Sequence, residues 1–286
     1  MSTLTIRHRT SYYYRQPVQL GPHRLMLRPR EGHDIDLASF DLDITPDAGI
    51  SWARDVAGNA VATAIFPSIT DRLVIESRSV LRVGAVAWPV FAISASAIAY
   101  PFRYSDDEWT DLGSLAVMQY PDANHRLHDW AQGFVRGNPT DTLALLKDLS
   151  AGVPGWIAYQ ARDDEGTQSP VETLNRGGGS CRDFAVLFVE AARSLGFGAR
   201  IVSGYLDNRA ETLVGQDAAG STHAWAEVFV LGAGWITFDP TNRSVGGFNL
   251  VPVATGRAMH QIAPVSGSYA GPAKMLDHMS VEVELR

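Results

Sequence analysis

Three side chains in the second half of the chain have the types and the order that thiol-based acyl transfer requires. Cys181, the only cysteine among the 286 residues, follows a Gly-Gly-Gly-Ser run at the expected start of a helix. The unpaired amides and dipole of a helix N-terminus favour thiolate over thiol. His223 begins an expected strand and Asp239 ends the next one. The pattern predicts a nucleophile, a general base and a residue that orients the base.

A packing interpretation competes with this one. A lone cysteine is more often a small buried side chain than a nucleophile, and a strand histidine with a strand-end aspartate is an ordinary surface feature. The three glycines before Cys181 argue against packing, because such a loop lets the backbone approach a substrate and is poorly suited to burying a side chain. With Cys181 present, the triad interpretation is the stronger one.

The element that must position Cys181 is a helix with a clear start and stop. Ser180 is a good N-cap residue, and Asp183 three positions later makes a variant of the capping box. An apolar stripe at helical spacing then runs to Gly196 and consists of Phe184, Leu187, Phe188, Ala191 and Leu195.

His223 and Asp239 are expected to be neighbours across a β-hairpin. Residues 200–206, 223–230 and 235–239 are candidate strands, and a glycine-rich loop joins the last two. If that loop has three residues, Val230 pairs with Gly234 and Asp239 lies opposite Trp225. His223 is then the diagonal neighbour of Asp239 on the same face, within reach of its carboxylate.

The rest of the chain predicts an α+β protein. The alternation from Leu4 to Tyr14, strands at 40–44 and 73–83 and a turn at 55–59 predict an antiparallel, sandwich-like β domain over residues 1–105. Helical spacing begins at Asp122, and the expected core over residues 106–245 packs helices on an antiparallel sheet. Residues 246–286 form a C-terminal extension with a closing strand at 280–285.

Composition and charge exclude several classes of function. The formal net charge is −7 and no basic block is present, so the chain lacks the basic surface with which a nucleic-acid binder neutralises phosphates. Residues 83–102 are uncharged, but prolines, a glycine and serines interrupt them, so we expect a buried strand running into a linker and no membrane partner. The first residues lack a signal-peptide apolar stretch, which makes the cytoplasm the expected location.

The sequence predicts no cofactor. A single cysteine excludes an intrachain disulfide and a multi-cysteine zinc site. His125 and His128 lie three residues apart with Asp122 and Asp129 nearby, but no further ligand signature completes a metal site. The glycines at 177–179 lack the lysine of a phosphate-binding loop.

Three segments resemble the core blocks of the transglutaminase-like superfamily, cysteine enzymes of papain-like fold. They are Gly-Gly-Ser-Cys-Arg-Asp-Phe-Ala at 178–185, Thr-His-Ala-Trp-Ala-Glu-Val at 222–228 and Trp-Ile-Thr-Phe-Asp-Pro-Thr at 235–241. Residues 8–14, 23–29, 55–59 and 264–269 are similar to a bacterial branch with an N-terminal β domain. The resemblance implies a papain-like core with Cys181, His223 and Asp239 as its triad.

The resemblance also suggests residues of the substrate cleft. Ser180 departs from the family, where a small aliphatic residue is common at this position, and no tryptophan is placed as the aromatic on the oxyanion side. The cleft and oxyanion candidates are Trp156, Tyr159, Gly179, Ser180 and Trp225, and the Cys181 amide is a further oxyanion donor.

The expected activity is that of an amide-bond enzyme which forms an acyl-thioester on a peptide or protein substrate. Hydrolysis is favoured over transfer to an amine, because water is abundant and no acyl-acceptor site is recognisable. A peptidase or amidase is therefore favoured over two alternatives, which are a protein-glutamine transglutaminase and a non-catalytic peptide-binding module that retains the fold.

Overall fold

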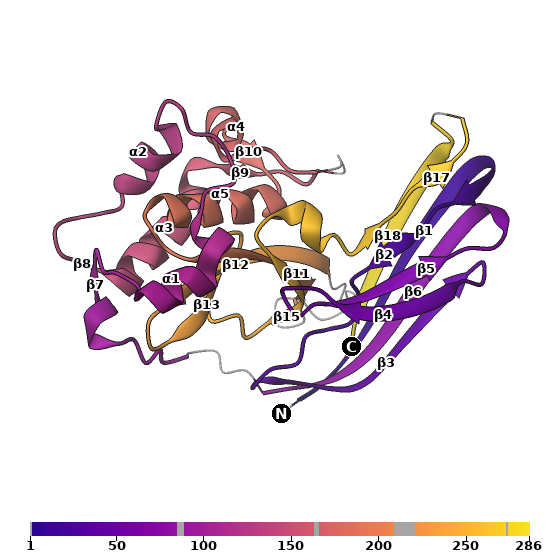
Figure 1. The fold of residues 1–286 in the computed structure, drawn as a ribbon, viewed down its shortest axis with the longest axis horizontal. Coiled ribbons are helices and arrows are strands. Elements are labelled where there is room, and N and C mark those ends of the chain that lie inside the picture. The colour runs from indigo at the N-terminus through magenta and orange to yellow at the C-terminus, as the bar shows by residue number, and fades with distance from the viewer. Residues whose placement is uncertain (1, 85–88, 163–165, 209–220, 273) are drawn as a thin grey trace.

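The computed structural model describes residues 2–84, 89–162, 166–208, 221–272 and 274–286. Two parts lie side by side: an antiparallel β module, and a core in which helices surround a sheet (Figure 1). The predicted α+β class and the order along the chain, strands first and helices later, are confirmed.

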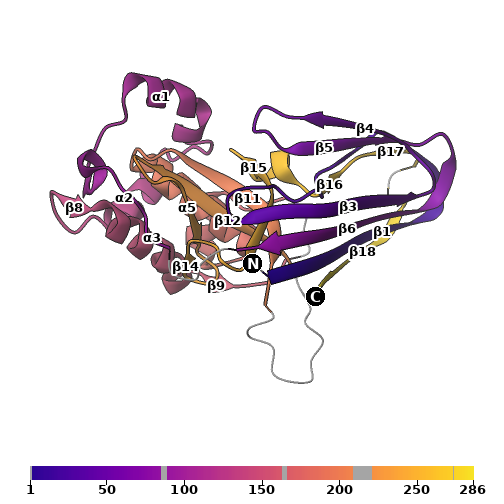
Figure 2. The same cartoon turned by 90° about the horizontal axis from the view of Figure 1, so that it is seen from below.

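The β module is a sandwich of two antiparallel sheets (Figure 2). The larger sheet has the order β17-β1-β6-β3, with β18 also paired to β1, and its strands are β1 (Ser2–Leu20), β3 (Ile35–Thr45), β6 (Ile69–Val83), β17 (Tyr269–Ala270) and β18 (Leu276–Leu285). The smaller sheet has the order β16-β2-β5-β4, from β2 (His23–Leu25), β4 (Gly49–Arg54), β5 (Ala60–Ile65) and β16 (Val265–Ser266). The alternation predicted near the N-terminus is confirmed in β1, where Leu4, Ile6 and His8 are buried.

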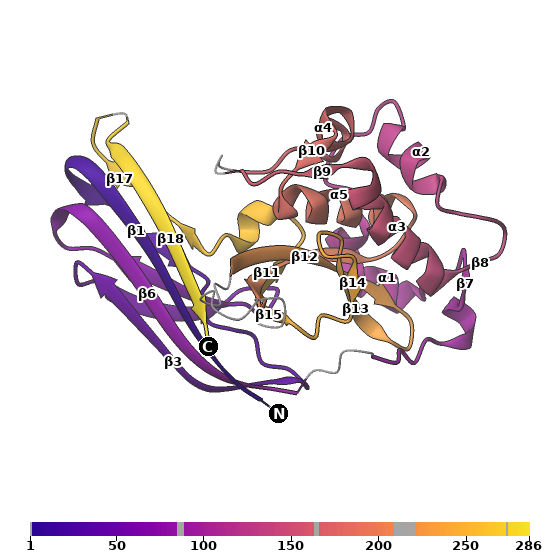
Figure 3. The same ribbon diagram turned by 180° about the vertical axis from the view of Figure 1, so that it is seen from behind.

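The end of the chain returns to the β module. The closing strand predicted at 280–285 lies within β18, which runs antiparallel to β1 from Ile6↔Leu285 onward (Figure 3). The structure thus divides residues 246–286 between the two parts, because β15 (Leu250–Gly256) completes the core sheet while β16, β17 and β18 belong to the β module.

The core is built on a five-stranded antiparallel sheet with the order β14-β13-β12-β11-β15. Its other strands are β11 (Ala199–Leu206), β12 (Ser221–Val230), β13 (Gly234–Asp239) and β14 (Ser244–Val245), which contain the three strands predicted from the sequence. Helix α5 (Cys181–Ser194) packs against β11 and β12 on one side and against α2, α3 and α4 on the other.

The remaining elements surround this arrangement. The helices are α1 (Asp106–Leu112), α2 (Arg126–Gln132), α3 (Thr142–Trp156) and α4 (Pro170–Arg176), with short turns η1 (Ala95–Ala97), η2 (Gly113–Ala116) and η3 (Met259–Ile262). Two-residue strands form two further pairs, β7 (Ala99–Tyr100) with β8 (Thr140–Asp141) and β9 (Ala158–Tyr159) with β10 (Gly178–Gly179).

The uncharged segment 83–102 differs from its prediction. Strand β6 ends at Val83, and residues 89–102 contain η1 and β7 but no buried strand, so this part of the prediction was wrong; residues 85–88 lie outside the described residues. Among the described residues, no helix combines the length and the apolar character needed to cross a membrane.

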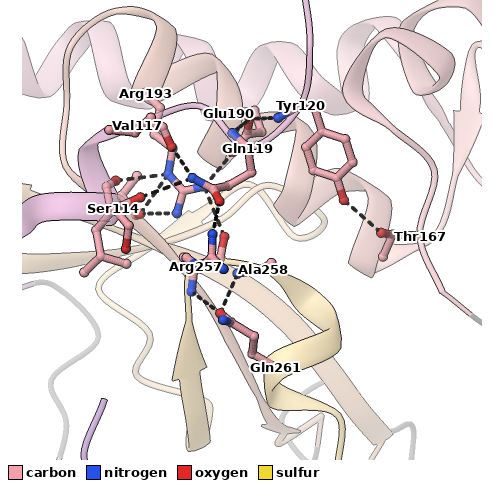
Figure 4. Close-up of polar contacts among 12 residues, drawn as sticks. Ser114, Val117, Gln119, Tyr120, Thr167, Glu190, Arg193, Arg257, Ala258 and Gln261 are labelled. Atoms are coloured by element: carbon pink, nitrogen blue, oxygen red, sulfur yellow. Dashed lines mark hydrogen bonds and ion pairs between the residues drawn. The ribbon is translucent and has the colours of Figure 1, made fainter. Parts of the chain in front are cut away.

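Helix α5 is buried from Phe184 to Arg193, so its polar residues must find partners inside the protein. The Arg193 guanidinium lies 2.6 Å from a carboxylate oxygen of Glu190 and donates to the carbonyls of Leu115, Ala199 and Arg257 (Figure 4). The Glu190 carboxylate also accepts the backbone N–H groups of Gln119 and Tyr120. The pair therefore connects α5 to three surrounding segments.

Replacing Arg193 with methionine is expected to lower the free energy of unfolding by about 3–5 kcal/mol, because Glu190 would remain buried without its cation. Urea denaturation measures the change. The control is Arg176→Met, which breaks an exposed pair with Glu172 on α4 and should cost at most about 1 kcal/mol. A loss below about 1 kcal/mol for Arg193→Met would contradict this role.

Candidate active site

The start of α5 is fixed by the buried carboxylate of Asp183. This carboxylate accepts the Ser180 N–H at 2.8 Å and the Ser180 hydroxyl at 2.9 Å, which confirms the predicted capping box. It also accepts the Gln168 N–H and one guanidinium N–H of Arg162. Cys181 is therefore held at the first position of the helix.

The hairpin of β12 and β13 has the predicted register. Val230 pairs with Gly234 and Ala226 with Phe238, which puts Asp239 opposite Trp225 when the register is continued by one residue. The imidazole of His223 lies diagonally across, and its Nε2 is 2.9 Å from Oδ2 of Asp239. Both side chains are buried, His223 with 7% of its surface exposed.

The Asp239 carboxylate is held by groups that follow it in the chain. Its Oδ1 accepts the backbone N–H groups of Thr241 and Asn242, as in an Asx turn. Its Oδ2 accepts the Asn242 side-chain amide at 2.7 Å as well as the His223 N–H. Asn242 was not predicted from the sequence, although the Asx turn expected at Asp-Pro was the signal that could have indicated it.

Cys181 lies where β13 stops. The β12–β13 register ends at Ala226↔Phe238. Beyond it, the backbone N–H of the buried Ala224 lies near the Cys181 sulfur and lowers the pKa of the thiol. His223 lies near the same sulfur and is the group that lowers the pKa of the thiol most. Because Nε2 of the imidazole is occupied by Asp239, Nδ1 is the nitrogen available to the thiol.

The environment favours charge on both Cys181 and His223. Burial raises the pKa of the Cys181 thiol, but the hydrogen bond and charge of His223 outweigh it, so the pKa lies below its ordinary value. The charge of Arg182 acts in the same direction. Burial lowers the pKa of His223, but hydrogen bonds to Asp239 and Cys181, and their charges, raise it to about 9. A thiolate beside an imidazolium can act as nucleophile and proton donor at neutral pH.

Two family models match the chain. Residues 4–82 match the bacterial transglutaminase-like N-terminal region, and residues 128–240 match the transglutaminase-like superfamily. Together the two matches cover more than half of the chain, and the second contains Cys181, His223 and Asp239. Residues 128–240 belong to the transglutaminase-like superfamily.

Individual proteins resemble the whole chain. An uncharacterized protein of Mycobacterium leprae (strain TN) is 24% identical over 286 residues, covering 95% of this chain and 94% of that protein. A solved structure described as a "Putative Cysteine Protease from Cytophaga hutchinsonii" has a TM-score of 0.73 at 18% identity and covers 100% of this chain and 91% of that chain. This likeness establishes the fold, β module included.

Within this transglutaminase-like core, Tyr159 is the cleft candidate that lies towards the thiol. It is exposed in β9, which pairs with β10 beside the start of α5. Burial and the nearby Cys181 thiolate both raise the pKa of its phenol. Trp156 is the exposed last residue of α3, and among the described residues no ring contact or hydrogen bond joins it to Cys181 or His223.

The other three cleft candidates lie buried next to Cys181 and His223. Gly179 and Ser180 are buried, and the Ser180 hydroxyl and N–H are both used by Asp183. Trp225 is only 1% exposed and stacks beside His223, with ring centroids 6.0 Å apart. Gly179, Ser180 and Trp225 are thus buried beside Cys181 and His223, and their place in a substrate cleft stays a prediction.

His125, which precedes α2, and His128 within α2 belong to no metal-binding group: among the described residues no cluster of three or more His, Cys, Asp or Glu side chains could hold an ion. His125 and His128 have ring centroids 6.4 Å apart. Both carboxylate oxygens of Asp122 accept backbone N–H groups, from Leu127 and His128. Asp122 therefore caps the first turn of α2.

Replacing Asn242 with alanine is expected to lower kcat about fivefold with little change in KM, because a lost hydrogen bond worth about 1 kcal/mol loosens Asp239 without touching substrate. Steady-state kinetics on a peptide that the protein turns over would separate the two constants. Thr241→Ala is the matched control, since it keeps the backbone N–H that Asp239 accepts. Equal effects of the two substitutions would contradict a role for the Asn242 amide.

Proposed function

We propose that the protein is a cysteine-dependent peptidase or amidase that works through an acyl-thioester. Cys181 is the nucleophile, His223 the acid and base, and Asp239 the residue that orients His223. The observation that carries the proposal is the position of the His223 imidazole, which hydrogen-bonds the Asp239 carboxylate through Nε2 and lowers the pKa of the Cys181 thiol beside it. These steps need only groups of the chain itself and a water molecule.

In the first half of the reaction, the Cys181 thiolate attacks the carbonyl carbon of an amide. The carbonyl oxygen becomes an oxyanion, for which the Cys181 N–H at the positive end of α5 is a suitable donor. The His223 imidazolium gives its proton to the nitrogen of the leaving amine, and the C–N bond breaks. The products of this half are a free amine, an acyl-thioester on Cys181 and a neutral imidazole.

In the second half, the neutral imidazole of His223 takes a proton from water as the water oxygen attacks the thioester carbonyl. The C–S bond breaks, releasing a carboxylic acid and restoring the thiolate and imidazolium. A primary amine in place of water would give a new amide by the same steps. Water is the proposed acceptor because of its concentration.

The test is mass spectrometry of a peptide library incubated with the protein in ¹⁸O-labelled water, with and without methylamine. Hydrolysis predicts peptides that carry ¹⁸O in a new carboxyl group, and amine transfer predicts methylamides. The matched control is Cys181→Ala, which should form neither product. Products that persist in Cys181→Ala, or peptides that wild-type protein retains without converting, would overturn the proposal.

A further inference from the structure

The β module carries a groove that is separate from the candidate active site. It has a volume of about 720 Å³ and is lined mainly by residues of β3 and β4, the edge strands of the two sheets. One wall contains Phe40 and Leu42 of β3, and the other contains Ile50, Trp52 and Arg54 of β4.

Small residues on the neighbouring strand explain why the groove is open. Arg54, Trp52 and Ile50 pair across to three alanines of β5, which are Ala60, Ala62 and Ala64. Methyl groups cannot fill the space between the sheets here, so Trp52 remains 48% exposed and Ile50 40% exposed. An edge-to-face contact between Phe40 and Trp52, with centroids 5.8 Å apart, joins the two walls.

Strand β4 also presents a free edge beside the groove. In the described part of the chain β4 pairs with β5 alone, and all six of its residues are exposed. A free edge offers backbone N–H and C=O groups to another strand, and proteins usually protect it with lysine or proline. Strand β4 contains neither. The facing edge strand, β3, carries Asp41 and Asp43 and is less suited to an acidic partner.

The charges at the groove favour an acidic partner. Arg54 lies on the same face of β4 as Trp52, and its guanidinium donates to the Gly58 carbonyl at 3.2 Å. Arg28 lies over the Phe40 ring at 5.8 Å and makes a weak surface pair with Glu31. Two guanidinium groups thus line the groove against the single carboxylate of Asp41.

We propose that this groove binds an extended acidic peptide segment, which adds to the free edge of β4 as a further strand. Backbone hydrogen bonds to β4 supply affinity, and the alternate side chains that point into the groove supply specificity. An inward carboxylate meets Arg54, and an inward apolar side chain packs on Ile50 and Trp52. This binding does not require the chemistry at Cys181.

The probe is the blocked heptapeptide Thr-Glu-Thr-Val-Thr-Glu-Thr with a fluorescent label, whose Glu and Val side chains share one face when it is extended. Its anisotropy is titrated with the full-length Cys181→Ala protein, so that turnover cannot interfere. Saturable binding is expected, and the peptide with lysine in place of glutamate should bind at least about tenfold more weakly. Two further peptides carry backbone N-methyl groups on either the odd or the even positions, and only one set should abolish binding, because successive N–H groups of a strand point to opposite edges.

Variants locate the site. Trp52→Ala and Arg54→Glu should each weaken binding about tenfold, which corresponds to about 1.4 kcal/mol. Trp109→Ala and Arg136→Glu are matched controls away from the groove, and Trp109 is 49% exposed, like Trp52. Absence of saturable binding, equal binding of the lysine peptide, equal effects of the two N-methyl sets or insensitivity to Trp52→Ala and Arg54→Glu would each overturn the proposal. The charge and N-methyl comparisons use unchanged groove residues, so a folding defect in a variant cannot produce them.

Discussion

Replacing Asp239 with asparagine is expected to lower kcat at neutral pH by about 10³- to 10⁴-fold, although the substitution hardly changes the size of the side chain. The reason is the position of one proton. Asp239 accepts from Nε2 of His223, which leaves Nδ1 free to exchange a proton at Cys181. Asparagine would keep its oxygen on the two backbone N–H groups of the turn and direct its NH₂ group at Nε2. The neutral imidazole would then carry its proton on Nδ1. This nitrogen faces Cys181, and once protonated it could not accept a proton from the thiol or from the attacking water.

Kinetics of Asp239→Asn on a peptide substrate would measure this loss, and the chain offers a closely matched control. Asp55 in the β module also accepts two backbone N–H groups, from Ala57 and Asn59, and the Asn59 side-chain amide. Asp55→Asn makes the same chemical change in the same kind of turn without a histidine. If Asp239→Asn retains more than about a tenth of wild-type kcat, the orienting role of Asp239 fails.

The parts of the candidate site that the sequence predicted depend on local rules. Ser180 and Asp183 define a helix start by their spacing, and the capping box forms as expected. The hairpin register follows from a three-residue loop and the period of two in strands, so the contact between His223 and Asp239 could be predicted without knowing the rest of the fold.

The parts that the sequence did not predict depend on contacts between distant segments. Trp225 shares a face with His223, but its burial requires Gly204 on β11, where an added Cβ would lie 2.7 Å from the Trp225 ring. The pairing of β18 with β1 joins residues more than 260 positions apart. The groove beside β4 lies between the edge strands of two different sheets, and the sequence shows only three alternate alanines in β5.

Replacing His223 with alanine is expected to move the pH dependence of Cys181 alkylation to higher pH. His223 is the main group that lowers the pKa of the thiol, and burial alone raises that pKa. Without His223 the pKa should return to at least the unperturbed value of about 8.5. Iodoacetamide should then react about 10- to 100-fold more slowly near pH 6, the smaller figure allowing for the greater nucleophilicity of a more basic thiolate.

The direction of each limb of the pH profile follows from the pKa shifts of Cys181 and His223. In the wild-type protein the thiolate forms below the ordinary pKa of a thiol, and the imidazolium persists up to a pKa of about 9. Peptide turnover should therefore rise with pH as the thiol ionises and fall as pH passes about 9, when the proton donor is lost, with both limbs belonging to the coupled pair. His128→Ala is the control, because His128 lies on α2 and leaves the thiol's hydrogen bonds intact. Alkylation curves that coincide for wild type and His223→Ala would mean that His223 is not the partner of Cys181, and the acyl-thioester mechanism would lose its proton donor.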